Sequence, residues 1–177
     1  LKSLDNLINY ITYFLVFAYS IIIWIICNNF FGRIFLNNLS FDNREGYIWY
    51  NGDLLEWKNA NVHVLNHGLH YASCVFEGER AYRGKIFETE KHTKRLFNSA
   101  KSLDMKIPFS EKEVIEAKDI LLQKNSLSDA YVRPVVWRGS EMMAVSAQST
   151  KIHVAIAVWN WPSYFDPEQK MQGIKLD

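Results

Sequence analysis

An uncharged apolar run near the N-terminus divides this chain into two parts of different character. No charged residue occurs between Asn6 and Gly32, and the segment Leu7–Cys27 consists almost entirely of Leu, Ile, Val, Phe, Tyr and Trp. A bilayer core requires about 20 consecutive apolar residues, so this run is long enough to span a membrane. A secretory signal fits less well, because the run is too long and no small-residue cleavage site follows it. The flanking charges, with Arg33 and Arg44 on the C-terminal side, only weakly favour a cytosolic C-terminal part.

The origin of this leader, residues 1–45, stays open. The chain begins with Leu1 rather than Met, and the leader is rich in Ile, Asn, Phe and Tyr. A membrane anchor and a spurious extension joined to an unrelated domain both fit these features. The polar string that ends at Glu45, followed by Gly46, predicts the domain boundary.

The composition of the whole chain excludes several classes of protein. The 177 residues include 20 Lys and Arg against 19 Asp and Glu, and a near-neutral balance gives no electrostatic footprint for nucleic acid. Apolar residues make up 49% and charged residues 22%, so the chain can bury a core. The two cysteines, Cys27 and Cys74, cannot form a disulfide framework or a four-cysteine zinc site. We expect reduced thiols in a cytoplasmic protein, with Cys74 packed as a small residue.

The region after the boundary predicts alternating short strands and helices, and therefore an α/β or α+β domain. Two hairpins are indicated, one turning at Asn51-Gly52 and one at Arg83–Lys85, the second between strands at 75–82 and 86–87. Asn-Gly readily takes the positive φ that a tight primed turn demands.

Two helices and two long strands follow. We expect a Thr89 cap at the start of the first helix and a capping box, Ser110–Glu113, at the start of the second. The runs 130–137 and 152–159 are typical of strands. The second run is apolar on both faces, which suits a strand that is covered on two sides.

Three histidines, His63, His67 and His70, lie close together in the sequence, so a metal site has to be considered. The segment does not predict a helix, because Gly68 interrupts it, and no cysteine or acid follows at a metal-ligand spacing. We therefore expect loop histidines that make hydrogen bonds. The chain also lacks GxGxxG, GxxxxGK[ST] and GxSxG, so a nucleotide-binding fold and a hydrolase elbow have no support.

Three arginines, Arg80, Arg95 and Arg133, are candidates for anion binding. Arg133 lies in an otherwise apolar strand, where a buried guanidinium needs either an acid or a bound anion. An internal salt bridge, for example with Glu77 or Glu79, and a role in binding carboxylate or phosphate are equally compatible with these residues.

Five motifs occur in order along the chain: Tyr47–Gly52, Val62–Tyr71, Val75–Tyr82, His92–Leu96 and Ala130–Pro134. Together they resemble the N-terminal half of the branched-chain amino-acid aminotransferases, which are class IV (fold-type IV) pyridoxal-phosphate enzymes. The resemblance covers about residues 46–177 and leaves out the leader. It implies an α+β fold, with the small N-terminal domain over residues 46–160 and the start of the interdomain linker and large domain over 161–177.

The resemblance implies roles for individual residues. Arg95 resembles the arginine that holds the phosphate of pyridoxal 5′-phosphate. Tyr131 resembles a tyrosine that helps bind the substrate α-carboxylate, and Arg133 resembles the arginine that receives the distal carboxylate of glutamate. Phe76, Trp161 and Tyr164 resemble walls of the apolar side-chain pocket, and Arg80 is a further substrate-binding candidate. Tyr71 and the loop that contains Val145 match segments that reach the pocket of the neighbouring subunit, which implies a homodimer or larger assembly.

The activity that the resemblance implies is transfer of an amino group from leucine, isoleucine or valine to 2-oxoglutarate. The Schiff-base lysine of the family lies beyond the position of Asp177, so we assign no catalytic residue and no metal ligand, and we expect an incomplete chain that is inactive alone. Two alternatives stay open: a non-catalytic membrane-tethered module, and another enzyme of the fold, a D-amino-acid aminotransferase or an aminodeoxychorismate lyase. The context of Arg133 and the string Phe76–Arg80 favour the branched-chain type.

Overall fold

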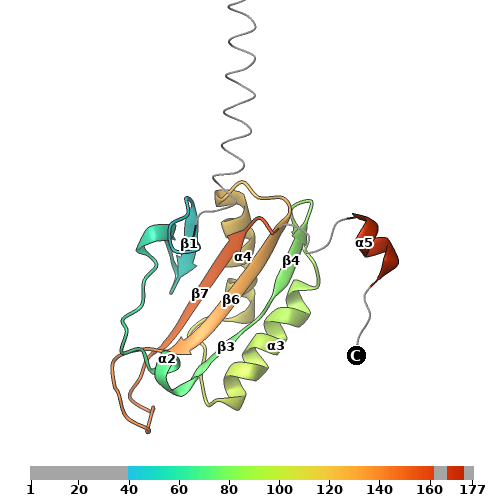
Figure 1. Cartoon of the computed structure of the whole chain (residues 1–177). Helices are drawn as coiled ribbons and strands as arrows, with labels where there is room; N and C mark the ends of the chain where they lie inside the picture. The colour runs from blue at the N-terminus through green and yellow to red at the C-terminus, as the bar shows by residue number, and fades with distance from the viewer. Residues whose placement is uncertain (1–39, 162–166, 174–177) are drawn as a thin grey trace, which may run out of the picture. The chain divides into compact units, whose positions relative to one another are not determined.

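The computed structural model describes residues 40–161 and 167–173, so the predicted membrane segment, residues 7–27, lies outside the described residues. The chain divides into two units between Arg44 and Glu45, next to the predicted boundary. The second unit is a mixed α+β domain built on one antiparallel sheet (Figure 1). Within residues 40–161 and 167–173, no helix is long and apolar enough to cross a bilayer.

The sheet brings together strands that are far apart in the sequence. Its strand order is β2-β1-β7-β6-β4-β5, and β3 also pairs with β6. The longest pairing joins β6 and β7, from Tyr131 opposite Trp159 to Arg138 opposite Ile152. The strands are β1 (Tyr47–Tyr50), β2 (Asp53–Glu56), β3 (Cys74–Phe76), β4 (Glu79–Tyr82), β5 (Lys85–Ile86), β6 (Ala130–Arg138) and β7 (Ile152–Trp159).

Both predicted hairpins are confirmed. Asn51 and Gly52 have φ values of 52° and 106° between β1 and β2, the positive values that a primed turn requires. Arg83 and Gly84 turn the chain between β4 and β5 with φ values of 52° and 77°. The predicted strand 75–82 is instead two short strands, because β3 ends at Phe76 and β4 begins at Glu79.

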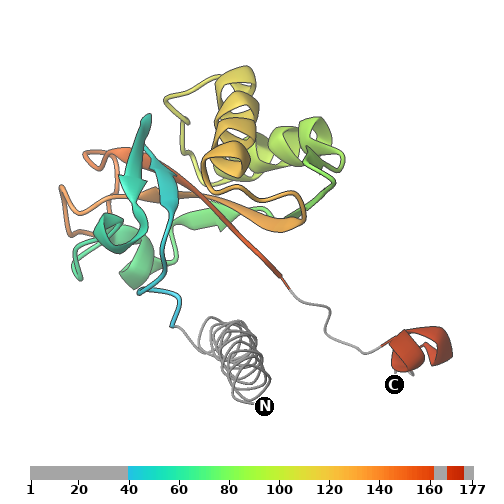
Figure 2. The same ribbon diagram turned by 90° about the horizontal axis from the view of Figure 1, so that it is seen from above.

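Helices α3 (Thr89–Ser102) and α4 (Glu111–Lys124) cover one face of the sheet (Figure 2). The predicted capping box of α4 is confirmed, since the Glu113 amide donates to Ser110 Oγ and the Ser110 amide donates to the Glu113 carboxylate. The predicted Thr89 cap is wrong. Glu88 precedes α3 with a φ of 51° and no side chain caps the helix, because the Thr89 hydroxyl lies near the Lys118 amine instead.

Three short helices complete the described secondary structure: η1 (Trp57–Asn59), α2 (His67–Tyr71) and α5 (Pro167–Gln172). The expectation that Gly68 interrupts a helix is wrong, since Gly68 lies inside α2. A Cβ at this position would lie 3.2 Å from the Trp137 Cβ, so glycine lets α2 pack closely on β6.

The hydrophobic core lies between the sheet and the two long helices. Alternate residues of β6 and β7 are buried there, while their neighbours on the opposite face are only partly buried. In the described residues, helix α4 covers one face of β7, so the expectation of a strand covered on two sides is met on one face only. The core includes Leu96, Ala100, Val114, Leu121, Val132, Val136, Val154, Ile156 and Val158.

Candidate active site

The face of the sheet opposite α3 and α4 carries an aromatic cluster. Side chains alternate along a strand, so Tyr131 points away from the helices when Val132 is buried against them. The Tyr131 ring centroid lies 4.9 Å from that of Trp159 and 5.1 Å from that of Trp161. Arg80 joins this cluster from β4, where its Nη1 donates to the Trp161 carbonyl at 3.4 Å. The result is an apolar surface edged by a cation.

Arg133 lies on the same face, and no acidic side chain of the described residues pairs with it. Its guanidinium carbon is 4.1 Å from the centroid of the Phe76 ring, and its Nη2 donates to the Tyr131 hydroxyl at 2.8 Å. Its buried Nε has no hydrogen-bond partner in the described part of the chain. Arg133 therefore does not form the internal salt bridge with Glu77 or Glu79 that the sequence left open. The aromatic ring supports the cation and leaves its charge available to an anion.

Gly78 makes room for this arrangement. A Cβ on Gly78 would lie 2.2 Å from the Tyr131 hydroxyl oxygen. Any other residue at position 78 would therefore force the Tyr131 ring to move. The glycine thus fixes where Tyr131 can hold Arg133.

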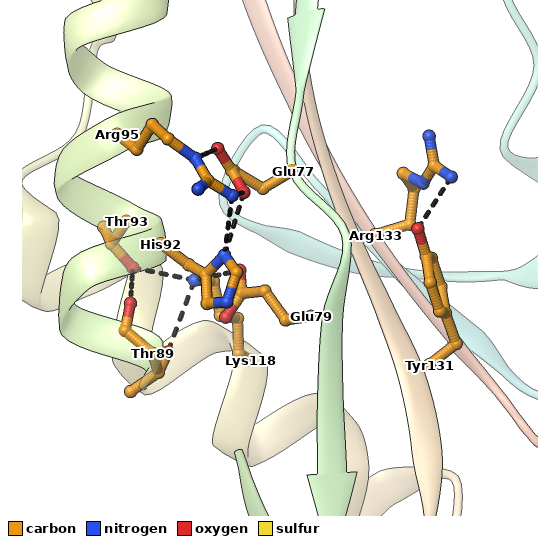
Figure 3. A network of polar contacts seen from close by, with 9 residues as sticks. All are labelled: Glu77, Glu79, Thr89, His92, Thr93, Arg95, Lys118, Tyr131 and Arg133. Atoms are coloured by element: carbon orange, nitrogen blue, oxygen red, sulfur yellow. Dashed lines mark hydrogen bonds and ion pairs between the residues drawn. The ribbon is translucent and has the colours of Figure 1, made fainter. Parts of the chain in front are cut away.

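Arg95 lies on α3 and does form an ion pair. Its Nε and Nη2 donate to the two carboxylate oxygens of Glu77, each at 2.5 Å (Figure 3). His92 Nδ1 donates to the same carboxylate at 2.9 Å. The Glu77 side chain is 5% exposed, whereas the Arg95 side chain is 65% exposed. Burial alone would raise the pKa of Glu77, but the hydrogen bonds from Arg95 and His92 outweigh burial and lower this pKa.

The ion pair occupies one edge of the Arg95 guanidinium. Nη2 also lies 3.2 Å from His92 Nδ1, while Nη1 makes no hydrogen bond within the described residues. A guanidinium has two edges that can each meet an oxyanion with a pair of N–H groups. The exposed edge of Arg95 therefore fits a phosphate group even though Glu77 holds the other edge.

A second ion pair lies close by and is fully buried. Lys118 Nζ of α4 is 2.6 Å from Glu79 Oε1 of β4, and both side chains are 0% exposed. The same amine donates to the Thr93 hydroxyl at 2.7 Å. Burial raises the pKa of Glu79 and lowers that of Lys118, and their mutual attraction opposes both changes. Sequence reasoning missed Lys118, although a lysine on the stripe of Val114 and Leu121 is a signal for a buried charge.

The three histidines make hydrogen bonds, as predicted, but His67 and His70 lie in α2 and not in a loop. His67 is buried, and its nitrogens lie 3.0 Å from the Ser73 hydroxyl and 3.0 Å from the Ala144 carbonyl. His63 accepts from the Leu65 amide, and His70 donates to the Val64 carbonyl. The described residues hold no group of three side chains suited to a metal ion.

The structure brings together some of the predicted site residues and leaves others apart. Phe76, Arg80, Tyr131, Arg133 and Trp161 share the open face of the sheet. Tyr71 and Val145 are 45% and 88% exposed and contact none of these five by a hydrogen bond or ring contact in the described structure. Tyr164 lies outside the described residues. The expectation that Cys74 is packed is wrong: it is exposed, because β3 turns that side chain to the open face.

Comparison with known proteins gives the family of this chain. The family profile described as Amino-transferase class IV matches residues 74–176. The branched-chain-amino-acid aminotransferase of Pseudomonas aeruginosa is 46% identical over 142 residues, which is 78% of this chain and 46% of that protein. A probable branched-chain-amino-acid aminotransferase of Rickettsia bellii is 47% identical over 116 residues, 66% of this chain and 40% of that protein.

Solved structures of similar proteins give the same result. The Escherichia coli branched-chain amino acid aminotransferase superposes with a TM-score of 0.67 at 36% identity, over 71% of this chain and 43% of that one. The T.th. branched-chain amino acid aminotransferase with pyridoxamine 5′-phosphate gives 0.64 at 38% identity, over 67% and 41%. This chain thus spans less than half the length of these relatives. The matched profile covers more than half of the chain, and the chain therefore belongs to the class IV aminotransferase family.

Proposed function

We propose that this chain supplies the substrate-binding face and the phosphate-binding arginine of a branched-chain amino-acid transaminase. The observation that carries the proposal is Arg133, a cation without an acidic partner in the described residues, held by Phe76 and Tyr131 beside an aromatic cluster. Such a surface suits a ligand that is sometimes aliphatic and sometimes a dicarboxylate. The similar proteins named as branched-chain aminotransferases support this choice of substrate.

The aromatic cluster and Arg133 would each bind a different part of the two kinds of substrate. The rings of Phe76 and Trp161 would remove the side chain of leucine, isoleucine or valine from water, at about 25 cal/mol per Å² of apolar area. Arg133 would pair with the distal carboxylate of 2-oxoglutarate or glutamate. Tyr131 accepts a hydrogen bond from Arg133, so its own proton is left to donate to a substrate carboxylate.

Arg95 would hold the phosphate of pyridoxal 5′-phosphate through its exposed edge. When bound, this cofactor supplies the electron sink that allows an amino group to pass between an amino acid and a 2-oxo acid. The pyridoxamine 5′-phosphate in a structure of a similar protein supports this choice of cofactor.

A homodimer or larger assembly is part of the proposal. Apolar side chains are exposed on the segments around α2 and the β6–β7 connection, and exposed apolar groups of this kind mark interaction surfaces. Tyr71 and Val145 belong to this set and would reach the neighbouring subunit. The set is Val62, Val64, Leu65, Leu69, Tyr71, Met142, Met143 and Val145. A cytoplasmic location stays a prediction from the sequence.

Complementation tests the proposed function. The chain is mixed with the separately expressed C-terminal half of the Pseudomonas aeruginosa relative, and amino transfer from L-leucine to 2-oxoglutarate is followed. We expect transamination in the mixture, none with either half alone, and none with D-leucine. Activity with D-leucine only would assign the chain to the D-amino-acid enzymes of the fold. Assembly of the halves without any transamination would contradict the proposal.

A further inference from the structure

We propose that Glu77 is a positioning residue that fixes the Arg95 guanidinium so that its exposed edge faces the cofactor phosphate. This inference rests on the function proposed above and extends it to a carboxylate that acts only through Arg95. On this inference Arg95 both forms an ion pair and binds an anion, because the ion pair with Glu77 orients the guanidinium toward the phosphate.

The Glu77 carboxylate is a fixed anchor. Its side chain is 5% exposed and accepts hydrogen bonds from Arg95 Nε, Arg95 Nη2 and His92 Nδ1. Its backbone amide donates to the Pro134 carbonyl at 3.0 Å, which ties the residue to β6. The exposed member of the pair is Arg95, whose long side chain would otherwise sample many rotamers.

The contacts leave a defined part of the guanidinium for a ligand. Nε and Nη2 are directed at Glu77, and Nη2 also lies 3.2 Å from His92 Nδ1, so the two N–H groups of Nη1 are the ones without a partner in the described residues. These groups lie on the edge of the planar fork that matches a second oxyanion. An arginine that is held in this way loses less conformational freedom when phosphate binds.

Glu77 is not required to attach α3 to the sheet. Leu96 and Ala100 bury α3 in the core, and the Lys118 amine bonds Thr93 of this helix while it pairs with Glu79. In Figure 3 this second network lies beside the Glu77–Arg95 pair, on the same side of β4, and Lys118 contacts Glu79 and Thr93 rather than Glu77. Removal of the Glu77 charge should therefore change the orientation of Arg95 and leave the helix in place.

An opposing account makes the opposite prediction. A carboxylate so close to Arg95 lowers the positive potential that a phosphate dianion meets, so Glu77 could simply weaken cofactor binding. On that account, replacing Glu77 with glutamine strengthens the binding of phosphate. On ours, the same change weakens it, because the guanidinium is no longer held.

The experiment compares Glu77→Gln, Glu77→Asp and the matched control Glu88→Gln, which removes a carboxylate from an exposed ion pair with Lys91 at the start of the same helix. Affinity for pyridoxal 5′-phosphate and for pyridoxal, which lacks the phosphate, is measured on the chain complemented with the C-terminal half. We expect Glu77→Gln to weaken binding of the phosphorylated compound about tenfold, with no change for pyridoxal and none in the control. Glu77→Asp keeps the charge but is too short to hold both nitrogens, and we expect it to weaken phosphate binding as well.

A second readout is independent of catalysis. In ¹⁵N NMR spectra of the chain, the Arg95 Nε–H should give a signal protected from exchange, and this signal should disappear in Glu77→Gln. Unchanged or tighter phosphate binding in both Glu77 variants would overturn the inference. A third result separates the two proposals. If the complemented wild type binds pyridoxal 5′-phosphate and the Glu77 variants show these losses, but the wild type transfers no amino group, the proposed function fails and the role of Glu77 stands.

Discussion

Three consecutive residues, the last of β3 and the two that join it to β4, each contact a different candidate site residue. Phe76 lies under the Arg133 guanidinium, and Glu77 holds Arg95. Gly78 leaves the space that the Tyr131 hydroxyl occupies. Alternation along the strand sends neighbouring side chains to opposite faces of the sheet, so this short break in pairing serves both the open face and the helix side.

Replacing Gly78 with alanine tests this arrangement at a single residue. The new Cβ would displace the Tyr131 hydroxyl and break its hydrogen bond with Arg133, so we expect a loss of about 1–3 kcal/mol of unfolding free energy, as for other overpacked sites. Chemical denaturation measures this loss. The double variant Gly78→Ala/Tyr131→Phe lacks the clashing oxygen and should be less destabilised than the two single changes added together. Additive losses would mean that the clash is relieved elsewhere.

The sequence identifies the important arginines but does not say which of them is paired. Arg95 and Arg133 carry the same charge, and Glu77 and Glu79 are candidate partners for both. The pairing depends on which face of the sheet each side chain takes, and that is set by the break after Phe76. Within the run 75–82, Gly78 signals a break in the strand, but it does not indicate which face Glu77 takes.

At the scale of elements, a buried ion pair joins both long helices to the sheet. Lys118 of α4, Glu79 of β4 and Thr93 of α3 meet in a region with no solvent exposure. A buried charge that loses its partner keeps the full desolvation penalty. These residues therefore stabilise the packing of the helices only as a complete set.

Replacing Lys118 with methionine should lower the free energy of unfolding by about 3–5 kcal/mol, because Glu79 is left as an unpaired buried acid. Urea denaturation measures the change. The double variant Lys118→Met/Glu79→Leu removes both charges and should recover most of the lost stability. A single variant as stable as the wild type would show that the pair is not buried in solution.

A helix end or a hairpin is predicted correctly where neighbouring residues in the sequence give a strong signal for it. The capping box of α4 has two residues that confirm each other, Ser110 and Glu113, and its prediction is correct. Thr89 alone has no such partner, and the nearby Lys118 engages its hydroxyl instead. Asn51-Gly52 marks a hairpin because few residue pairs accept two successive positive φ values. The place of Lys118 on the apolar stripe of α4 signals a buried charge, but its partner is not predictable, since Glu79 is distant in the sequence.

At the scale of the whole molecule, acid should weaken the fold in part through Glu77. Its pKa is lowered from 4.5 in the folded protein, so the carboxylate contributes stability above the unfolded pKa and loses it as the pH falls through the folded pKa. We therefore expect the difference in unfolding free energy between the wild type and Glu77→Gln to be largest near neutral pH and to vanish in acid. Denaturation curves at a series of pH values measure this difference. A difference that is constant with pH would contradict the ion pair with Arg95.

The sheet of the described domain presents two unlike faces. In the described residues, helices cover one face of the sheet, and the other carries Arg133, Tyr131, Phe76 and Trp161, with Arg80 at the edge. The alternation in β6 and β7 indicates that one face is buried. Only the structure gives the register that sets Tyr131 opposite Trp159 and Arg133 opposite the small Ala157. That register brings the Tyr131 and Trp159 rings into contact in the aromatic cluster.

The central claim is that Arg133 recognises the distal carboxylate of a dicarboxylate substrate. The most direct test is the Michaelis constant of the complemented protein for 2-oxoglutarate and for 4-methyl-2-oxopentanoate, in the wild type and in Arg133→Ala, with Arg83→Ala as the control. Loss of a hydrogen-bonded charge pair should raise the constant for 2-oxoglutarate roughly 10- to 100-fold and leave that for the branched 2-oxo acid nearly unchanged. An equal rise for both substrates, or none for 2-oxoglutarate, would contradict the account.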